Sequence, residues 1–218
     1  MATAERGLRA DAQRNLAHIL EAARQVFAEQ GLEASVAEVA ERAGVGTATI
    51  FRRFPTKHDL LAAVVEQRLG EIAERALHAA ASRDASKAFR HFMQEAVESF
   101  IGDRGFCEAG PSGLLADPEI RARIDEITAS VERVLERAQA AGEVRRDVTS
   151  EDIPVLLSAV AQAGLSLEHV TPGIWRRYLD LALDGLHPDG ARPLSRKAPT
   201  RRQIDASRGD RPAAFREP

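Results

Sequence analysis

Residues 35–57 read SVAEVAERAGVGTATIFRRFPTK and carry the most specific structural signal in the chain. Ser35 and Glu38 have the spacing of a capping box, in which the serine hydroxyl and the glutamate carboxylate each bind a free backbone N–H at a helix start. The turn Gly44-Val45-Gly46 then leaves about three residues between this helix and a second one over about 46–54. Two short helices joined by so tight a turn predict a helix-turn-helix.

The second of these helices has two chemically different faces. At 100° per residue, Ile50 and Phe54 point together toward a core. The opposite face and its flanks carry small residues, threonines, a phenylalanine and two arginines: Thr47, Ala48, Thr49, Phe51, Arg52 and Arg53. No acidic residue occurs between Glu41 and Asp59. Such a face suits the major groove of DNA.

Helical periodicity continues along most of the remaining chain, and no segment has the pattern of a strand. Besides the two short helices, we expect helices over about 14–30, 56–81, 87–101, 117–141, 150–169 and 172–186. The fold class is therefore all-α, with a DNA-binding domain over 1–55 and a second helical domain over 56–190. Residues 191–218 are basic, rich in Pro and Arg, and without periodicity, so we expect this tail to be disordered.

The distribution of charge fits these three parts. Residues 1–59 carry 8 basic and 8 acidic side chains, residues 60–191 carry 14 and 22, and residues 192–218 carry 8 and 3. An acidic body approaches DNA only where positive charge is locally concentrated. Arg52, Arg53 and Lys57 form one such place.

Composition and motifs exclude several other classes. No run of about 18 apolar residues predicts a membrane span, and the polar N-terminus lacks a signal-peptide core. The single cysteine cannot form an internal disulfide, which together with these features places the protein in the cytoplasm. No phosphate-binding glycine loop, nucleophile elbow or metal-ligand spacing is present, so we expect no catalytic residues, no metal and no cofactor. An enzyme is the rival hypothesis that these absences disfavour.

Residues 16–64 resemble the DNA-binding region of the tetracycline-repressor (TetR) family. The resemblance is carried by Phe27-Ala-x-x-Gly31, by Val39-Ala40-x-x-Ala43-Gly44-Val45, and by Thr49-Ile50-Phe51-Arg52-x-Phe54-Pro55-x-Lys57. This chain has Gly46 where the family commonly has Ser, and Phe51 where it commonly has Tyr. Glycine is an acceptable helix N-cap, whereas Phe51 lacks the hydroxyl that serves the family as a phosphate contact.

The resemblance implies a ligand-responsive regulator, most often a repressor, that binds a palindromic double-stranded DNA operator as a homodimer and is released by a small-molecule inducer. The DNA-contacting residues that the sequence and the resemblance together predict are Ser35, Thr47, Ala48, Thr49, Phe51, Arg52, Arg53 and Lys57. The arm arginines Arg6 and Arg9 either enter a minor groove or belong to a disordered tail. A third hypothesis keeps the helical dimer but gives it protein partners instead of DNA.

The C-terminal half resembles one branch of the family more loosely, through residues 138–147 and the late segment Arg177-Tyr-Leu-x-Leu-x-Leu-Asp-Gly-Leu186. It implies that residues 150–169 and 172–186 form the dimer interface as a four-helix bundle, with close approach at small residues: Ala159, Ala161, Ala163 and Gly164. An inducer would bind in the core of the second domain. Candidate lining residues, each also explicable as plain core, are Phe92, Met93, Phe106, Cys107, Leu114 and Ile127.

Overall fold

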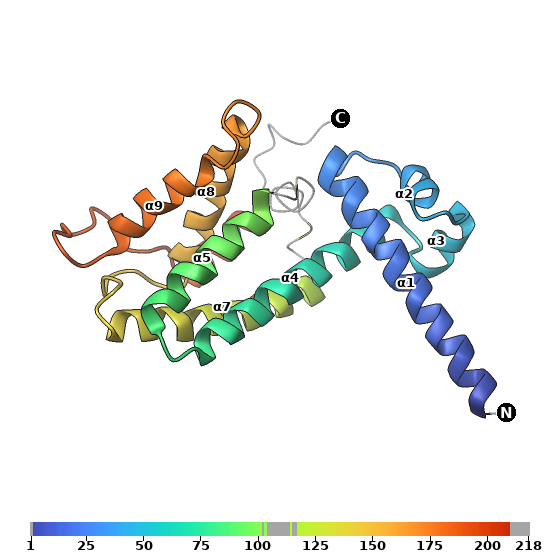
Figure 1. Cartoon of the computed structure of the whole chain (residues 1–218), viewed down its shortest axis with the longest axis horizontal. Helices are drawn as coiled ribbons and strands as arrows, with labels where there is room; N and C mark the ends of the chain where they lie inside the picture. The colour runs from blue at the N-terminus through green and yellow to red at the C-terminus, as the bar shows by residue number, and fades with distance from the viewer. Residues whose placement is uncertain (1, 102, 104–113, 115–116, 210–218) are drawn as a thin grey trace.

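A computed structural model describes residues 2–101, 103, 114 and 117–209, and within these residues it contains helices and no strand (Figure 1). The prediction of an all-α fold is confirmed. The helices are α1 (Ala2–Gln30), α2 (Val36–Arg42), α3 (Thr47–Arg53), α4 (Lys57–Ala81), α5 (Ala85–Ile101), α7 (Pro118–Ala140), α8 (Asp152–Leu167), α9 (Trp175–Leu186) and α10 (Arg201–Gly209).

The helices form a small head at one end of an elongated body. α1, α2 and α3 make the head, and α4 runs from the head along the length of α7 (Figure 1). α5 packs on α4 and α7 on one side and on α8 and α9 on the other. The pair α8 and α9 therefore forms an outer layer far from the head (Figure 1).

Two apolar cores meet along α4. The first joins the head helices to the first half of α4, up to Leu69, and to Ile120 and Ile124 of α7. The second begins at Ile72 and joins the second half of α4 to α5, α7, α8 and α9. The sequence-based boundary at residue 55 falls at the break between α3 and α4, but the head core continues across it.

The first helix is longer than its apolar pattern predicts. The stripe of apolar residues begins near residue 14, whereas α1 begins at Ala2. The additional residues are mainly Ala, Arg, Leu, Gln and Glu, which favour helix intrinsically even where no core is available. Arg6 and Arg9 thus belong to a helix and not to a disordered tail, and their contact with DNA stays a prediction.

The basic tail also differs from the expectation of disorder. Thr200 and Gln203 form a capping box at the start of α10: the Thr200 N–H donates to Gln203 Oε1 at 2.8 Å, and the Gln203 N–H donates to Thr200 Oγ1 at 3.4 Å. Arg201 then binds Asp125 and, at 3.2 Å, the hydroxyl of Thr128, both on α7. The tail is therefore attached to the body through α10.

None of the helices in the described part of the chain is both long and apolar enough to cross a membrane.

Candidate nucleic-acid interface

The head holds its short helices through a tight turn and an ion pair. Gly44 has φ +62°, and the N–H groups of Gly44 and Val45 donate to the carbonyls of Glu41 and Ala40 at 3.1 and 3.0 Å. This is a Schellman motif, in which a left-handed glycine closes the helix end. Arg42 makes two bonds of 2.8 and 2.7 Å to the carboxylate of Glu29, which joins α2 to the end of α1.

The third helix shows the two faces that the sequence predicts. Ile50 is completely buried and Phe54 is 7% exposed in the head core. On the other side Thr47, Ala48, Arg52 and Arg53 are exposed, and Phe51 is 45% exposed, which is unusual for an aromatic residue without a hydroxyl. α3 is anchored by its inner face, so the outer side chains project from a rigid support.

The two arginines of α3 are not neutralised by their own chain. Arg52 Nη2 donates to the hydroxyl of Thr49 at 3.3 Å, an exposed contact one helical turn away. Among the residues that the structure describes, no carboxylate pairs with Arg52 or Arg53. Their guanidinium groups can therefore bind guanine edges or phosphates without first breaking an ion pair.

Two further predicted residues begin neighbouring helices. Ser35 is exposed and closes the predicted capping box: its N–H and hydroxyl donate to the Glu38 carboxylate at 2.7 Å, and its hydroxyl accepts the Glu38 N–H at 3.3 Å. The bonds from the Ser35 backbone and then from its hydroxyl lower the pKa of Glu38, and the charge of Lys57 lowers it further. Lys57, the first residue of α4, is thus within electrostatic range of the start of α2.

This arrangement combines three kinds of anion-binding group. α3 supplies two arginines and two threonine hydroxyls, Lys57 supplies a point charge, and the N-terminal turn of α2 supplies backbone N–H groups. Phosphate positioning and base contact can therefore be divided between the ends of α2 and α4 on one hand and the side chains of α3 on the other.

The structure places the candidate ligand-pocket residues in different parts of the core. Phe92 and Met93 are fully buried on α5 in the second core. Leu114 is buried in the head core, and Ile127 is half-buried against both cores. Phe106 and Cys107 lie outside the described residues. None of the four lines either of the two cavities described below, and their role in ligand binding stays a prediction.

Two small cavities lie elsewhere. One is at the junction of head and body, lined by Phe27, Leu32, Leu61, Val64, Val65, Arg68 and Asp103. The other is near the start of α5, lined by Ser86, Phe89, Arg90, Glu143, Val144, Leu183, Asp184, Leu186 and His187. In the described ranges, no cluster of His, Cys, Asp or Glu has the arrangement of a metal site.

The helices predicted to form a dimer expose apolar side chains. α8 has no charged residue after Asp152, and Val155 on its outer side is 56% exposed. Leu181 on α9 is also 56% exposed. Two of the small residues, Ala161 and Gly164, face their own chain, and Gly164 allows α8 to approach α9 closely: a Cβ there would lie 2.6 Å from Trp175 Cβ. The part of the small residues in an interface between chains stays a prediction.

Comparison with known proteins agrees with this architecture. Residues 19–64 match the description "Bacterial regulatory proteins, tetR family", and residues 84–188 match "Transcriptional regulator SbtR-like, C-terminal domain". No curated protein matches the chain significantly.

Several solved structures are similar over most of their length. A TetR transcription regulatory protein from Mycobacterium vanbaalenii is 34% identical, with 83% of this chain and 99% of that one covered and a TM-score of 0.61. A TetR regulator from Streptomyces coelicolor is 28% identical (78% and 97% covered, TM-score 0.60). PfmR from Thermus thermophilus is 26% identical (78% and 98% covered, TM-score 0.55).

The helix-turn-helix with its exposed arginines, the helical second domain and these matches over both parts lead to one conclusion: the chain belongs to the TetR family of bacterial transcriptional regulators.

Proposed function

We propose that this protein is a ligand-responsive repressor that binds a palindromic operator as a homodimer and leaves it when a small molecule binds the second domain. The outer face of α3 is the observation that carries the proposal. It presents Arg52, Arg53 and Thr47 on a helix whose other side is buried, and no described carboxylate of the chain competes for the arginines. Ala48, Thr49 and Phe51 would contact base edges, with Ser35 and Lys57 on phosphates.

The proposed dimer is supported by α8 and α9, which lie far from the head (Figure 1). In the proposed four-helix bundle, the exposed apolar side chains of α8 and α9 would be buried against a second copy. A two-fold dimer would present its two α3 helices to successive major grooves about 34–36 Å apart, or to grooves a multiple of that distance apart. The regulator would act on the chromosome, in the cytoplasm.

Release by a ligand needs two states of the dimer with different operator affinities. α4 belongs to both apolar cores, so a change in the second core that moves α4 also moves the head. A ligand that favours the state with the wrong spacing between the two α3 helices would release the operator.

The test is binding of the purified full chain to DNA from upstream of its own gene, compared with scrambled DNA of equal length and composition, between about 50 and 200 mM salt. We expect tight binding to a palindrome that weakens steeply with salt, and weaker binding to the scrambled DNA. Equal affinity for both DNAs at every salt concentration, together with no enrichment of a palindrome from a random pool, would contradict the proposal.

A further inference from the structure

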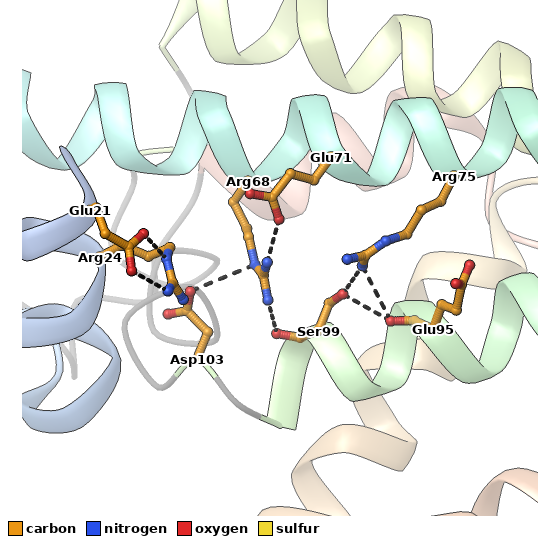
Figure 2. Close-up of polar contacts among 8 residues, drawn as sticks. All are labelled: Glu21, Arg24, Arg68, Glu71, Arg75, Glu95, Ser99 and Asp103. Carbon is orange, nitrogen blue, oxygen red and sulfur yellow. Dashed lines mark hydrogen bonds and ion pairs between the residues drawn. The ribbon is translucent and has the colours of Figure 1, made fainter. Parts of the chain in front are cut away.

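A group of charged residues lies at the level where α4 passes from the head core to the second core. Figure 2 shows Glu21 and Arg24 of α1, Arg68, Glu71 and Arg75 of α4, Glu95 and Ser99 of α5, and Asp103 just beyond α5. Leu69 is the last α4 residue in the head core and Ile72 is the first in the second core. Arg68 and Glu71 therefore lie at the stretch of α4 where the head core ends and the second core begins, and Arg75 lies one turn into the second core.

Arg68 is the centre of this group. Its guanidinium binds the carboxylate of Glu71, donates from Nη2 to the carbonyl of Ser99 at 2.9 Å, and places Nε 3.7 Å from Asp103 Oδ2 (Figure 2). The Arg68 side chain is only 12% exposed and that of Asp103 only 4% exposed. Charges so far removed from water contribute favourably only while their partners stay in place.

These contacts attach the end of α5 to α4. Ser99 lies in the last turn of α5, where carbonyls lack helical partners and the helix dipole is negative. α5 has no basic residue of its own in that turn, so Arg68 supplies the cation from another helix. Asp103 is tied to the same end, because its N–H donates to the carbonyl of Phe100 at 3.2 Å.

The same charges reach the head. Arg24 of α1 forms a two-bond pair with Glu21 at 2.9 and 2.7 Å. The pKa of Arg24 is raised, first by this pair and further by the charges of Asp103 and Glu71, while the charge of Arg68 helps to lower the pKa of Glu21. The small cavity at this junction is lined by Phe27 and Leu32 of the head together with Arg68 and Asp103, so the polar group borders the head directly.

We propose that Arg68 is a positioning residue that couples the second domain to the DNA-binding head. Through Arg68, the end of α5 and Asp103 fix the position of α4, and with it of α1 and α3, relative to the second core. The inference rests on the proposed function. It identifies the Arg68 contacts as the point at which a shift of the end of α5 would change the orientation of the head.

Arg75 provides a matched control. It lies two helical turns further along α4 and also binds Ser99, through the hydroxyl, with a second contact to the Glu95 carbonyl at 3.5 Å (Figure 2). Arg75 thus holds the same part of α5 from the side of the second core, without the contact to Asp103. Its removal takes away one attachment of α5 but keeps the Arg68 contacts to Ser99 and Asp103, so the head should stay in place.

The experiment measures head position directly. Spin labels are attached at two exposed positions, Glu41 on α2 and Glu132 on α7, through Glu41→Cys and Glu132→Cys in a Cys107→Ser background. Labelled protein is diluted in unlabelled protein, so that the distance measured is the one between two labels in the same chain. For the parent and for Arg75→Met we expect one narrow distribution of the distance between the two labels. For Arg68→Met and Asp103→Asn we expect a broad distribution or more than one distance. Equal distributions for Arg68→Met and the parent, or equal broadening in Arg75→Met, overturn the inference.

Two additions keep the result interpretable. If Arg68→Met does not fold, Arg68→Lys keeps the charge but not the fork of donors, and unchanged distributions in Arg68→Lys and Asp103→Asn overturn the inference. From random DNA the parent would select an operator, and one base pair inserted between its half-sites should weaken binding by the parent. For Arg68→Met this loss of affinity should be roughly tenfold smaller, which is within the usual range of coupling energies. If the parent selects no operator, the proposed function fails, and the distance measurement still decides the coupling.

Discussion

The outer faces of α3 and α8 are both uncovered in the single chain, yet their chemistry is opposite. α3 exposes arginines and threonines above a fully buried Ile50, and α8 exposes Val155 above a fully buried Ile153. Each helix is fixed by its buried side, so in both cases the exposed side is free to serve another molecule. The charged face fits a polyanion, and the uncharged face fits a second apolar surface.

An exposed side chain therefore indicates a function only when its partners within the chain are also considered. Arginines also occur on α4, but there Arg68 and Arg75 bind carbonyls and carboxylates of their own chain. Those of α3 have no described carboxylate within reach.

Replacing both α3 arginines, in Arg52→Ala/Arg53→Ala, should abolish specific DNA binding. An arginine that grips a base contributes about 1–3 kcal/mol, so the double variant should lose roughly a hundredfold or more in operator affinity. The melting temperature and the oligomeric state should not change, because both side chains are exposed. Fluorescence anisotropy with the selected operator measures the affinity.

A matched control removes two exposed arginines that lie outside the head helices α1 to α3, in Arg83→Ala/Arg121→Ala. The net charge changes equally, so a similar loss of affinity in this control would mean that overall charge, and not the face of α3, is responsible.

Charges placed on the apolar face, in Val155→Glu/Leu181→Glu, should dissociate the proposed dimer. Each buried aliphatic side chain contributes about 1.5–3 kcal/mol, and the two-fold axis doubles the loss. Sedimentation velocity should show a folded monomer. DNA binding by this monomer should be weak and limited to one half-site. Leu77→Glu on α4, where the leucine is 50% exposed outside the predicted interface, should leave the dimer intact. Dissociation by Leu77→Glu alone would move the interface to α4.

Local sequence signals were sufficient for much of this architecture. The capping boxes at Ser35 and Thr56 and the Asp117-Pro118 start are contacts within one helical turn, so residue types at fixed spacing predict them. The outer face of α3 follows from 100° geometry in the same way. Thr200 and Gln203 carry the same signal at α10, but no apolar stripe follows them, and a search for stripes overlooks them.

The contacts of Arg68 could not be predicted from residue spacing in this way. Arg68 lies four residues after Val64 and four before Ile72, which puts a charge on the apolar side of α4 and could have marked it as unusual. Its partners Ser99 and Asp103 are more than thirty residues away, and only tertiary packing brings them near. The four described pocket candidates show the same limit, because buried apolar residues do not themselves reveal which of them share a cavity.

The inner side of α8 should resist even a methyl group. A Cβ at Gly164 would lie 2.6 Å from Trp175 Cβ and 2.9 Å from Ile101 Cδ1. Such overpacking costs about 1–3 kcal/mol, so Gly164→Ala should lower the free energy of unfolding measured with urea. Gly70→Ala on α4 meets nothing within 4 Å and should instead raise it by about 0.5–1 kcal/mol. The same sign for both variants would contradict the close packing of α8 on α9.

The smallest effect concerns the support of the charged face. Ser35→Ala removes the cap of α2 and should destabilise the head by about 1 kcal/mol near neutral pH. The Ser35 N–H and hydroxyl lower the pKa of Glu38 in the folded state, so this contribution is present above the ordinary pKa of a glutamate and is lost as pH falls through the lower, folded value. The stability difference between parent and Ser35→Ala, measured by urea unfolding, should therefore shrink on going from about pH 6 to about pH 3. A difference that stays constant over this range would mean that the bond from the Ser35 hydroxyl to the Glu38 carboxylate adds nothing to the cap, because Ser35→Ala keeps the backbone N–H bond to that carboxylate.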